Sequence, residues 1–138
     1  MYITQGIGVM MFTLDEAQNS IAWLVDICKE ISPWRDKVQN LNVEIKTLQT
    51  RMQGNGGSAS HNKLDNLNSE LKTTVSKINH KISVIEEKGI IIKSIEPALF
   101  DFTYLMDGRE VYLCWREGEP RIDYWHEKDA GFAGRQKL

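Results

Sequence analysis

The stretch with the most reactive side chains lies near the C-terminus, where His126 is followed by Glu127 and Asp129. An imidazole beside two carboxylates can bind a divalent metal ion, and with Asp123 and Cys114 it can exchange protons or activate a thiol. No C-x-x-C or H-x-x-x-H spacing occurs in the chain. The sequence therefore predicts no metal site within one chain and no cofactor. A small metal-dependent or acid–base enzyme centred on His126 is the alternative function.

A second group of residues combines guanidinium groups, carboxylates and large aromatic rings. Guanidinium groups bind anions, and aromatic rings stack on planar ligands. The carboxylates can pair with the arginines instead of with a ligand. We expect this group to form the surface that recognises an anionic small ligand or a protein partner. Its members are Arg116, Arg121, Tyr112, Trp125, Asp101, Asp123 and Arg135.

These residues fall on a predicted antiparallel β-meander. Asp107-Gly108 is a strong signal for a two-residue hairpin turn, and the segment 117–120 (Glu-Gly-Glu-Pro) marks a second turn. Pro97 ends a β-branched segment or marks a sheet edge. The predicted strands are 90–95, 99–105, 109–116 and 121–126.

The register of the predicted sheet separates two faces. With the turns centred on 107–108 and 118–119, one face is apolar or aromatic except for His126, and it is expected to cover the helices. Its rows are Phe100–Trp115–Ile122, Phe102–Leu113–Tyr124 and Tyr104–Val111–His126. The opposite face carries the ionic residues, with Asp101, Cys114 and Asp123 in one row. This register makes His126 a core residue whose ring nitrogens are satisfied locally.

The segment 107–135, DGREVYLCWREGEPRIDYWHEKDAGFAGR, resembles the signature of an uncharacterised prokaryotic family, domain of unknown function 2203. The phrases FTLDEA at 12–17 and LFDF at 99–102 are also similar to the family pattern. The chain departs from it at Ser94, Ala98 and Thr103, where members often carry Asp, Gly and Pro. The resemblance implies the family's fold and a prokaryotic source, but no established activity.

The first half of the chain has the pattern of a long helix. Thr13 and Glu16 form a capping box. Apolar residues then recur in steps of three and four, as in a coiled-coil seam: Leu24, Ile27, Ile31, Trp34, Val38, Leu41, Ile45, Leu48 and Met52. Because the seam keeps its phase across Pro33, the sequence predicts one kinked helix over 14–52. Two helices, the second capped by Ser32, are the alternative.

A second seam follows a glycine-rich loop at 54–60 and runs from Leu64 to Ile85, and Gly89 suits the helix end. We therefore predict an α+β fold, in which a long antiparallel helical hairpin carries a small antiparallel β-meander packed at its open end. The predicted parts are an N-terminal arm or short strand at 1–12, the hairpin at 13–89, and the meander with its tail at 90–138. Two helices bury little apolar surface, so a homodimer through the helices is expected.

Composition limits the function classes. The 138 residues include 17 basic and 19 acidic side chains, and the net charge of −2 argues against a general nucleic-acid binder. No apolar run is long enough to cross a membrane, and only two cysteines, Cys28 and Cys114, are present. These features indicate a cytoplasmic protein. The sequence favours a non-enzymatic module that self-associates through the hairpin and binds a ligand or partner on its sheet.

Overall fold

The computed structural model describes residues 10–54 and 56–138, so most of the predicted arm at 1–12 lies outside the described residues. The chain divides into two compact units. One unit consists of residues 10–28 and 83–138 and contains the whole sheet; the other, residues 29–82, is purely helical apart from its loop. An α+β fold with a helical hairpin and a β-meander is therefore confirmed.

Helix α1 spans Leu14–Met52 and begins with the predicted capping box. The Thr13 backbone N–H donates to Glu16 Oε1 over 2.8 Å, and the Glu16 N–H donates to Thr13 Oγ1 over 3.0 Å. Two N–H groups at the helix start thus gain partners. Pro33 lies inside the continuous helix, so the prediction of one helix is confirmed and the two-helix alternative is wrong.

Helix α2 spans Ser58–Glu87 and is followed by Gly89, whose N–H donates to the Glu86 carbonyl oxygen. The φ angle of Gly89 is +83°, and a Cβ built there would lie 2.3 Å from Met10 Cβ. Both the backbone angle and the close approach require glycine at this position. Neither helix has a window that is long and apolar enough to span a membrane.

The helical unit 29–82 has a narrow core. Leu41 and Ile45 of α1 and Leu67 of α2 are buried, and half-buried leucines pack around them, namely Leu48, Leu64 and Leu71. An ion pair of 2.9 Å joins Lys37 and Glu70 across the two helices. The seam residues predicted from the sequence therefore hold the hairpin together.

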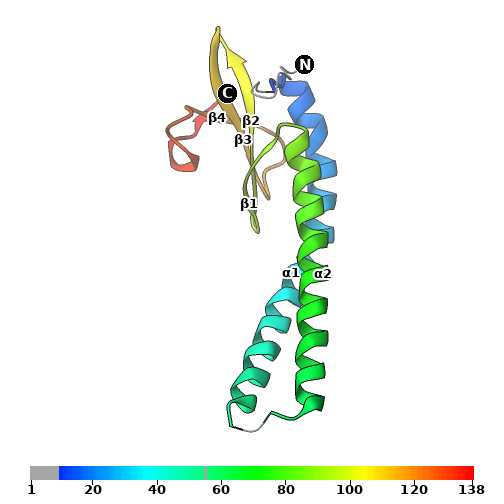
Figure 1. Ribbon diagram of the computed structural model, residues 1–138. Helices are drawn as coiled ribbons and strands as arrows, with labels where there is room; N and C mark the ends of the chain where they lie inside the picture. Colours follow the sequence, from blue (N-terminus) through cyan, green and yellow to red (C-terminus); the bar gives the residue numbers. More distant parts are fainter. Residues whose placement is uncertain (1–9, 55) are drawn as a thin grey trace. The chain divides into compact units, whose positions relative to one another are not determined.

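The sheet has five antiparallel strands in the order β1-β2-β3-β4-β5 (Figure 1). They are β1 Ile91–Ile95, β2 Ala98–Met106, β3 Arg109–Arg116, β4 Tyr124–His126 and β5 Gln136–Lys137, with a 3₁₀ turn at Phe132–Gly134. Asp107 and Gly108 both have positive φ angles, as the predicted two-residue turn requires. Strand β5 was not predicted, because a strand of two residues is too short to show an alternation of apolar and polar side chains.

The register of β2 against β3 is the predicted one. Phe100 lies opposite Trp115 with stacked rings, and Phe102 lies opposite Leu113. Phe102 also contacts the Phe12 ring edge-on, and Gln18 of α1 accepts a hydrogen bond from the Ile122 backbone N–H. The apolar face of the sheet is therefore buried within its own unit, as expected.

The predicted register of β4 is wrong by one residue. His126 lies opposite Tyr112, not Val111, and Trp125 lies opposite Leu113. The chain does not return directly into the sheet after the second turn, because residues 117–123 form a longer loop. A one-residue slip exchanges the faces of a strand. His126 therefore joins the face that carries Asp101 and Cys114.

Candidate metal centre

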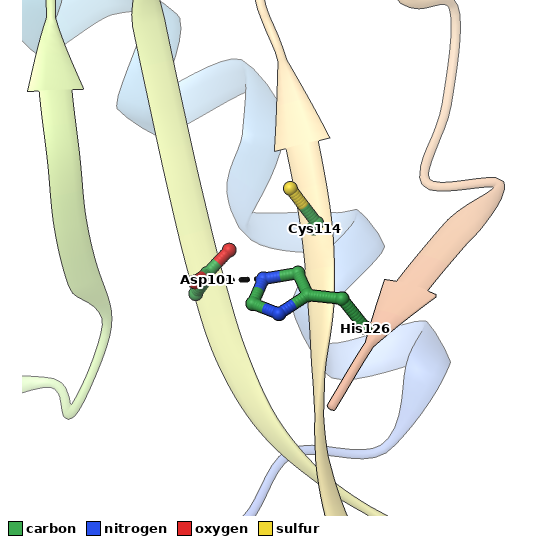
Figure 2. A group of neighbouring side chains, drawn as sticks. All are labelled: Asp101, Cys114 and His126. Atoms are coloured by element: carbon green, nitrogen blue, oxygen red, sulfur yellow. Dashed lines mark hydrogen bonds and ion pairs between the residues drawn. The ribbon is translucent and has the colours of Figure 1, made fainter. Parts of the chain in front are cut away.

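Three potential metal ligands meet on one face of three neighbouring strands: Asp101 on β2, Cys114 on β3 and His126 on β4 (Figure 2). Asp101 lies directly opposite Cys114, and His126 lies opposite Tyr112, two residues along the same face of β3. One carboxylate oxygen, the sulfur and one ring nitrogen all lie within 4.8 Å of one another. Each of the three residues is only 1% exposed.

The two ring nitrogens of His126 have different partners. Nδ1 lies 2.8 Å from the carbonyl oxygen of Glu127, and Nε2 lies 3.0 Å from Asp101 Oδ2. A carbonyl oxygen can only accept, so Nδ1 must carry a proton and donate it. In a neutral ring Nε2 then presents a lone pair to a carboxylate oxygen, which is also an acceptor. A proton or a cation must therefore lie between Nε2 and Oδ2.

The second oxygen of the Asp101 carboxylate is left over. By strict hydrogen-bond geometry Oδ1 has no partner among residues 10–54 and 56–138. The Cys114 thiol, a weak donor, is the polar group that faces this carboxylate. A buried carboxylate oxygen without a good donor is costly, and such an atom needs an explanation such as a bound ion.

Cys114 carries a protonated thiol at neutral pH. Burial raises its pKa to about 12, and the charge of Asp101 adds to the rise. The positive charge of the Arg135 guanidinium acts in the opposite direction and lowers the pKa of the thiol. A thiol with so high a pKa is a poor nucleophile at neutral pH.

The composition of the site is that of a Cys-His-Asp triad, but its geometry is not. A triad histidine binds the carboxylate with one ring nitrogen and faces the nucleophile with the other. In this site the second nitrogen of His126 binds the Glu127 carbonyl oxygen instead of facing Cys114. The imidazole therefore cannot take the thiol proton while Asp101 orients it.

Arg135 covers the site from the C-terminal tail. Its guanidinium carbon lies 4.1 Å from the ring centre of Tyr124 and 4.2 Å from that of Phe132. Nη2 forms an ion pair of 2.7 Å with Glu119 Oε2, and the side chain is 14% exposed. This arginine is thus fixed by two rings and a carboxylate, and its charge lowers the pKa of Cys114.

A family model described as "Uncharacterized conserved protein (DUF2203)" matches residues 10–138. The chain belongs to this family. Comparison with curated proteins and with solved structures finds no match. The description of DUF2203 names no activity, so the function of this member has to be argued from its site.

The other predicted ligand-binding residues of this DUF2203 chain are dispersed. Arg121 is exposed and pairs with Asp123 over 2.9 Å in the loop before β4. Arg116 is exposed, with its guanidinium 5.5 Å from the Phe132 ring centre. Trp125 lies on the opposite face from Tyr112, and Arg109 covers its ring. Of the predicted ligand-binding set, Asp101 and Arg135 are brought to the buried cluster, and Tyr112 contacts the His126 ring at its edge.

The predicted alternative sites share only some residues with the cluster. The Glu127 carboxylate binds Arg109 over 2.6 Å, and Asp129 is exposed in the following turn. Asp123 pairs with Arg121, so it does not lie beside Cys114 as the predicted register had it. Sequence reasoning missed that Asp101 and His126 meet. The pairing of Asp101 with Cys114 was readable from the hairpin, but the position of His126 was not.

Proposed function

We propose that this protein binds one divalent transition-metal ion of the Zn²⁺ class through Asp101, Cys114 and His126. The observation that carries the proposal is the meeting of two acceptors, His126 Nε2 and Asp101 Oδ2, 3.0 Å apart in a buried site. Two acceptor atoms that face each other repel. A cation between them, also bound by the Cys114 sulfur, removes this repulsion because both lone pairs then coordinate the ion. The three donor types are those that zinc uses, and a water or another group can fill a fourth position.

The chemistry of the donors selects the class of ion. A thiolate and an imidazole favour Zn²⁺ and its neighbours over Mg²⁺ and Ca²⁺, which prefer oxygen ligands. The two anionic ligands, a carboxylate and a thiolate, balance the charge of a divalent ion in a buried site. The Nδ1–H of His126 donates to the Glu127 carbonyl oxygen, which is the outer contact that fixes the tautomer of a metal-bound histidine.

Two competing interpretations are less well supported. A proton shared by His126 and Asp101 would satisfy that pair, but it leaves Asp101 Oδ1 without a hydrogen-bond partner among residues 10–54 and 56–138. Binding of an anionic ligand by Arg121 and Arg135 would require both to leave their carboxylates, because Arg121 pairs with Asp123 and Arg135 pairs with Glu119. The cluster is therefore the better candidate for function.

The test is a titration of chelator-treated full-length protein with Co²⁺, which reports a thiolate ligand by a sulfur-to-metal charge-transfer absorption band. Binding replaces the thiol proton of Cys114 by the metal and releases that proton to solvent. We expect one ion per chain and a charge-transfer band that is displaced by Zn²⁺. The band should vanish in Cys114→Ser.

Cys28→Ser is the matched control, because Cys28 is the other cysteine and lies on α1. It should keep the band. Absence of Co²⁺ and Zn²⁺ binding by the wild-type chain overturns the proposal, and so does a band that survives in C114S.

A further inference from the structure

We propose that a groove on the helical unit 29–82 is the surface through which two copies of this chain pair, with their α1 helices antiparallel. The groove has a volume of about 300 Å³ and lies near the end of α1. It shares no residue with the metal centre, so either proposal can fail without the other. Its walls include Val43, Glu44, Thr47, Leu48 and Arg51 of α1 and Lys63 of α2.

The α1 residues of the groove form an exposed stripe beside the coiled-coil seam. Thr47 lies at the centre of the stripe, about one turn after Glu44 and one turn before Arg51. All three side chains are exposed, whereas the neighbouring seam residues Leu41 and Ile45 are buried in the hairpin core. The hairpin thus uses one face of α1 for its own core and leaves the stripe open to solvent.

The two charges of the stripe have no partner in their own chain. Within residues 10–54 and 56–138, neither Glu44 nor Arg51 forms an ion pair, although other charged residues do join α1 to α2. Seven residues separate the two along one helix, which is about 10 Å along its axis. This distance is too long for them to pair with each other.

A second copy of the chain supplies both missing partners. If two α1 helices pack antiparallel about a two-fold axis beside Thr47, Glu44 of each copy lies beside Arg51 of the partner subunit. Because the axis makes every contact occur twice, one arrangement pairs all four charges. A parallel pairing in register would instead place like charges together, which costs free energy. The charge pattern therefore favours the antiparallel arrangement.

The residue at the axis allows the two helices to approach closely. The Thr47 hydroxyl donates to the Val43 carbonyl oxygen over 2.9 Å, so it is satisfied within its own helix. Its methyl group can then contact the partner helix without leaving a polar group unpaired. Val43, which is 62% exposed, and the half-buried Leu48 flank the stripe on its two sides. Association removes part of this apolar surface from water, which favours the dimer.

Sedimentation velocity of the full-length chain tests this interface. We expect the wild-type chain to form dimers whose dissociation constant rises with salt, because exposed ion pairs are screened. Glu44→Arg and Arg51→Glu each replace two attractive contacts by two repulsive ones, so each should raise the dissociation constant roughly tenfold. Lys46→Glu is the matched control, because Lys46 is exposed on the same helix outside the groove. It should keep the wild-type value.

The double variant, E44R with R51E, tests the orientation. It exchanges the two charges, so antiparallel helices regain both contacts, and the dissociation constant should return close to the wild-type value. An equimolar mixture of the two single variants should form mixed dimers for the same reason. All these positions are exposed, so circular dichroism should show the wild-type helix content in each variant.

Three results would overturn the proposal. A wild-type chain that stays monomeric across the concentration range would leave the groove to a different partner. Single variants that associate as tightly as K46E would place the dimer contact elsewhere on the chain. A double variant that associates no better than the single ones would exclude the antiparallel pairing of Glu44 with Arg51.

Discussion

His126 Nε2 lies 3.0 Å from Asp101 Oδ2, and neither side chain is more than 2% exposed. The other ring nitrogen is bound to a backbone carbonyl oxygen, so both nitrogens of this buried ring have protein partners. A buried charge without a partner is strongly destabilising, whereas a matched pair is tolerated. The contact therefore affects both the stability of the sheet and the binding of ions at the site. Variants of Asp101 test the two effects separately.

Replacement of Asp101 should separate stability from metal binding. Asp101→Ala removes one partner of a buried pair, and we expect it to lower the free energy of unfolding by about 3–5 kcal/mol. Asp101→Asn supplies an amide N–H that can donate to the Nε2 lone pair, so it should cost less than about 1 kcal/mol. Urea unfolding of the metal-free proteins measures both values.

The same two variants should behave alike toward metal. An asparagine cannot supply the anionic ligand, so D101N should lose most of the Co²⁺ affinity although it stays folded. If D101N bound Co²⁺ as the wild-type chain does, the carboxylate would have no part in the site.

The thiols of the metal-free chain should react slowly with iodoacetamide near neutral pH. Burial raises the pKa of Cys114 to about 12 and that of Cys28 to about 11. The thiolate is the reactive species, so the rate at each thiol should rise about tenfold per pH unit below these values. Cys28 should react before Cys114, as measured by mass spectrometry of peptides. Preferential modification of Cys114 at pH 7 would contradict the described environment.

Stability should fall at high pH for the same reason. An unfolded chain with an ordinary thiol pKa of 9.0 loses its proton first, while the folded site keeps the proton up to about pH 12. In this window the folded state binds more protons than the unfolded state, so the free energy of unfolding decreases as pH rises. Below pH 9 Cys114 adds no pH dependence. C114S should show a shallower decline than the wild-type chain in alkaline urea titrations.

Self-association through the helical hairpin stays a prediction, and its core can be tested. Leu41 and Ile45 are 5% and 8% exposed in the hairpin core. Leu41→Asp with Ile45→Asp would bury two unpaired carboxylates, and we expect loss of helix content or of association, measured by circular dichroism and light scattering. Val43→Asp is the control for helix content, because Val43 is 62% exposed. If the double variant kept the helix content and the particle mass of the wild-type chain, the predicted apolar seam between the helices would be wrong.

Arg116→Ala should leave the sheet intact. The side chain is exposed and contacts the Phe132 ring only through its guanidinium. Removal of such a contact should change the free energy of unfolding by no more than about 0.5 kcal/mol. Thermal unfolding measures this directly, and a large fall in Tm would show that the arginine supports the sheet.

The helices and the first hairpin were predictable because local rules decide them. A seam repeated over nine positions fixes the helical face, and a two-residue Asp-Gly turn leaves one register for Asp101 against Cys114. The strand that carries His126 was misplaced because its register depends on long-range contacts. Gln18 of α1 accepts a hydrogen bond from the Ile122 backbone N–H, 104 residues further along the chain. Contacts over such separations cannot be read from the turn residues alone.

The segment 117–123 that precedes β4 acts as a spacer whose length sets which residue of β4 lies opposite Tyr112. Deletion or insertion of one residue there, with the strand still paired, would turn the imidazole to the far side of the ribbon and put Glu127 or Trp125 opposite Tyr112. A change of two residues would restore the original side, but it would put Lys128 or Tyr124 in the place of His126. The exact length of one short connection therefore decides whether an imidazole reaches Asp101.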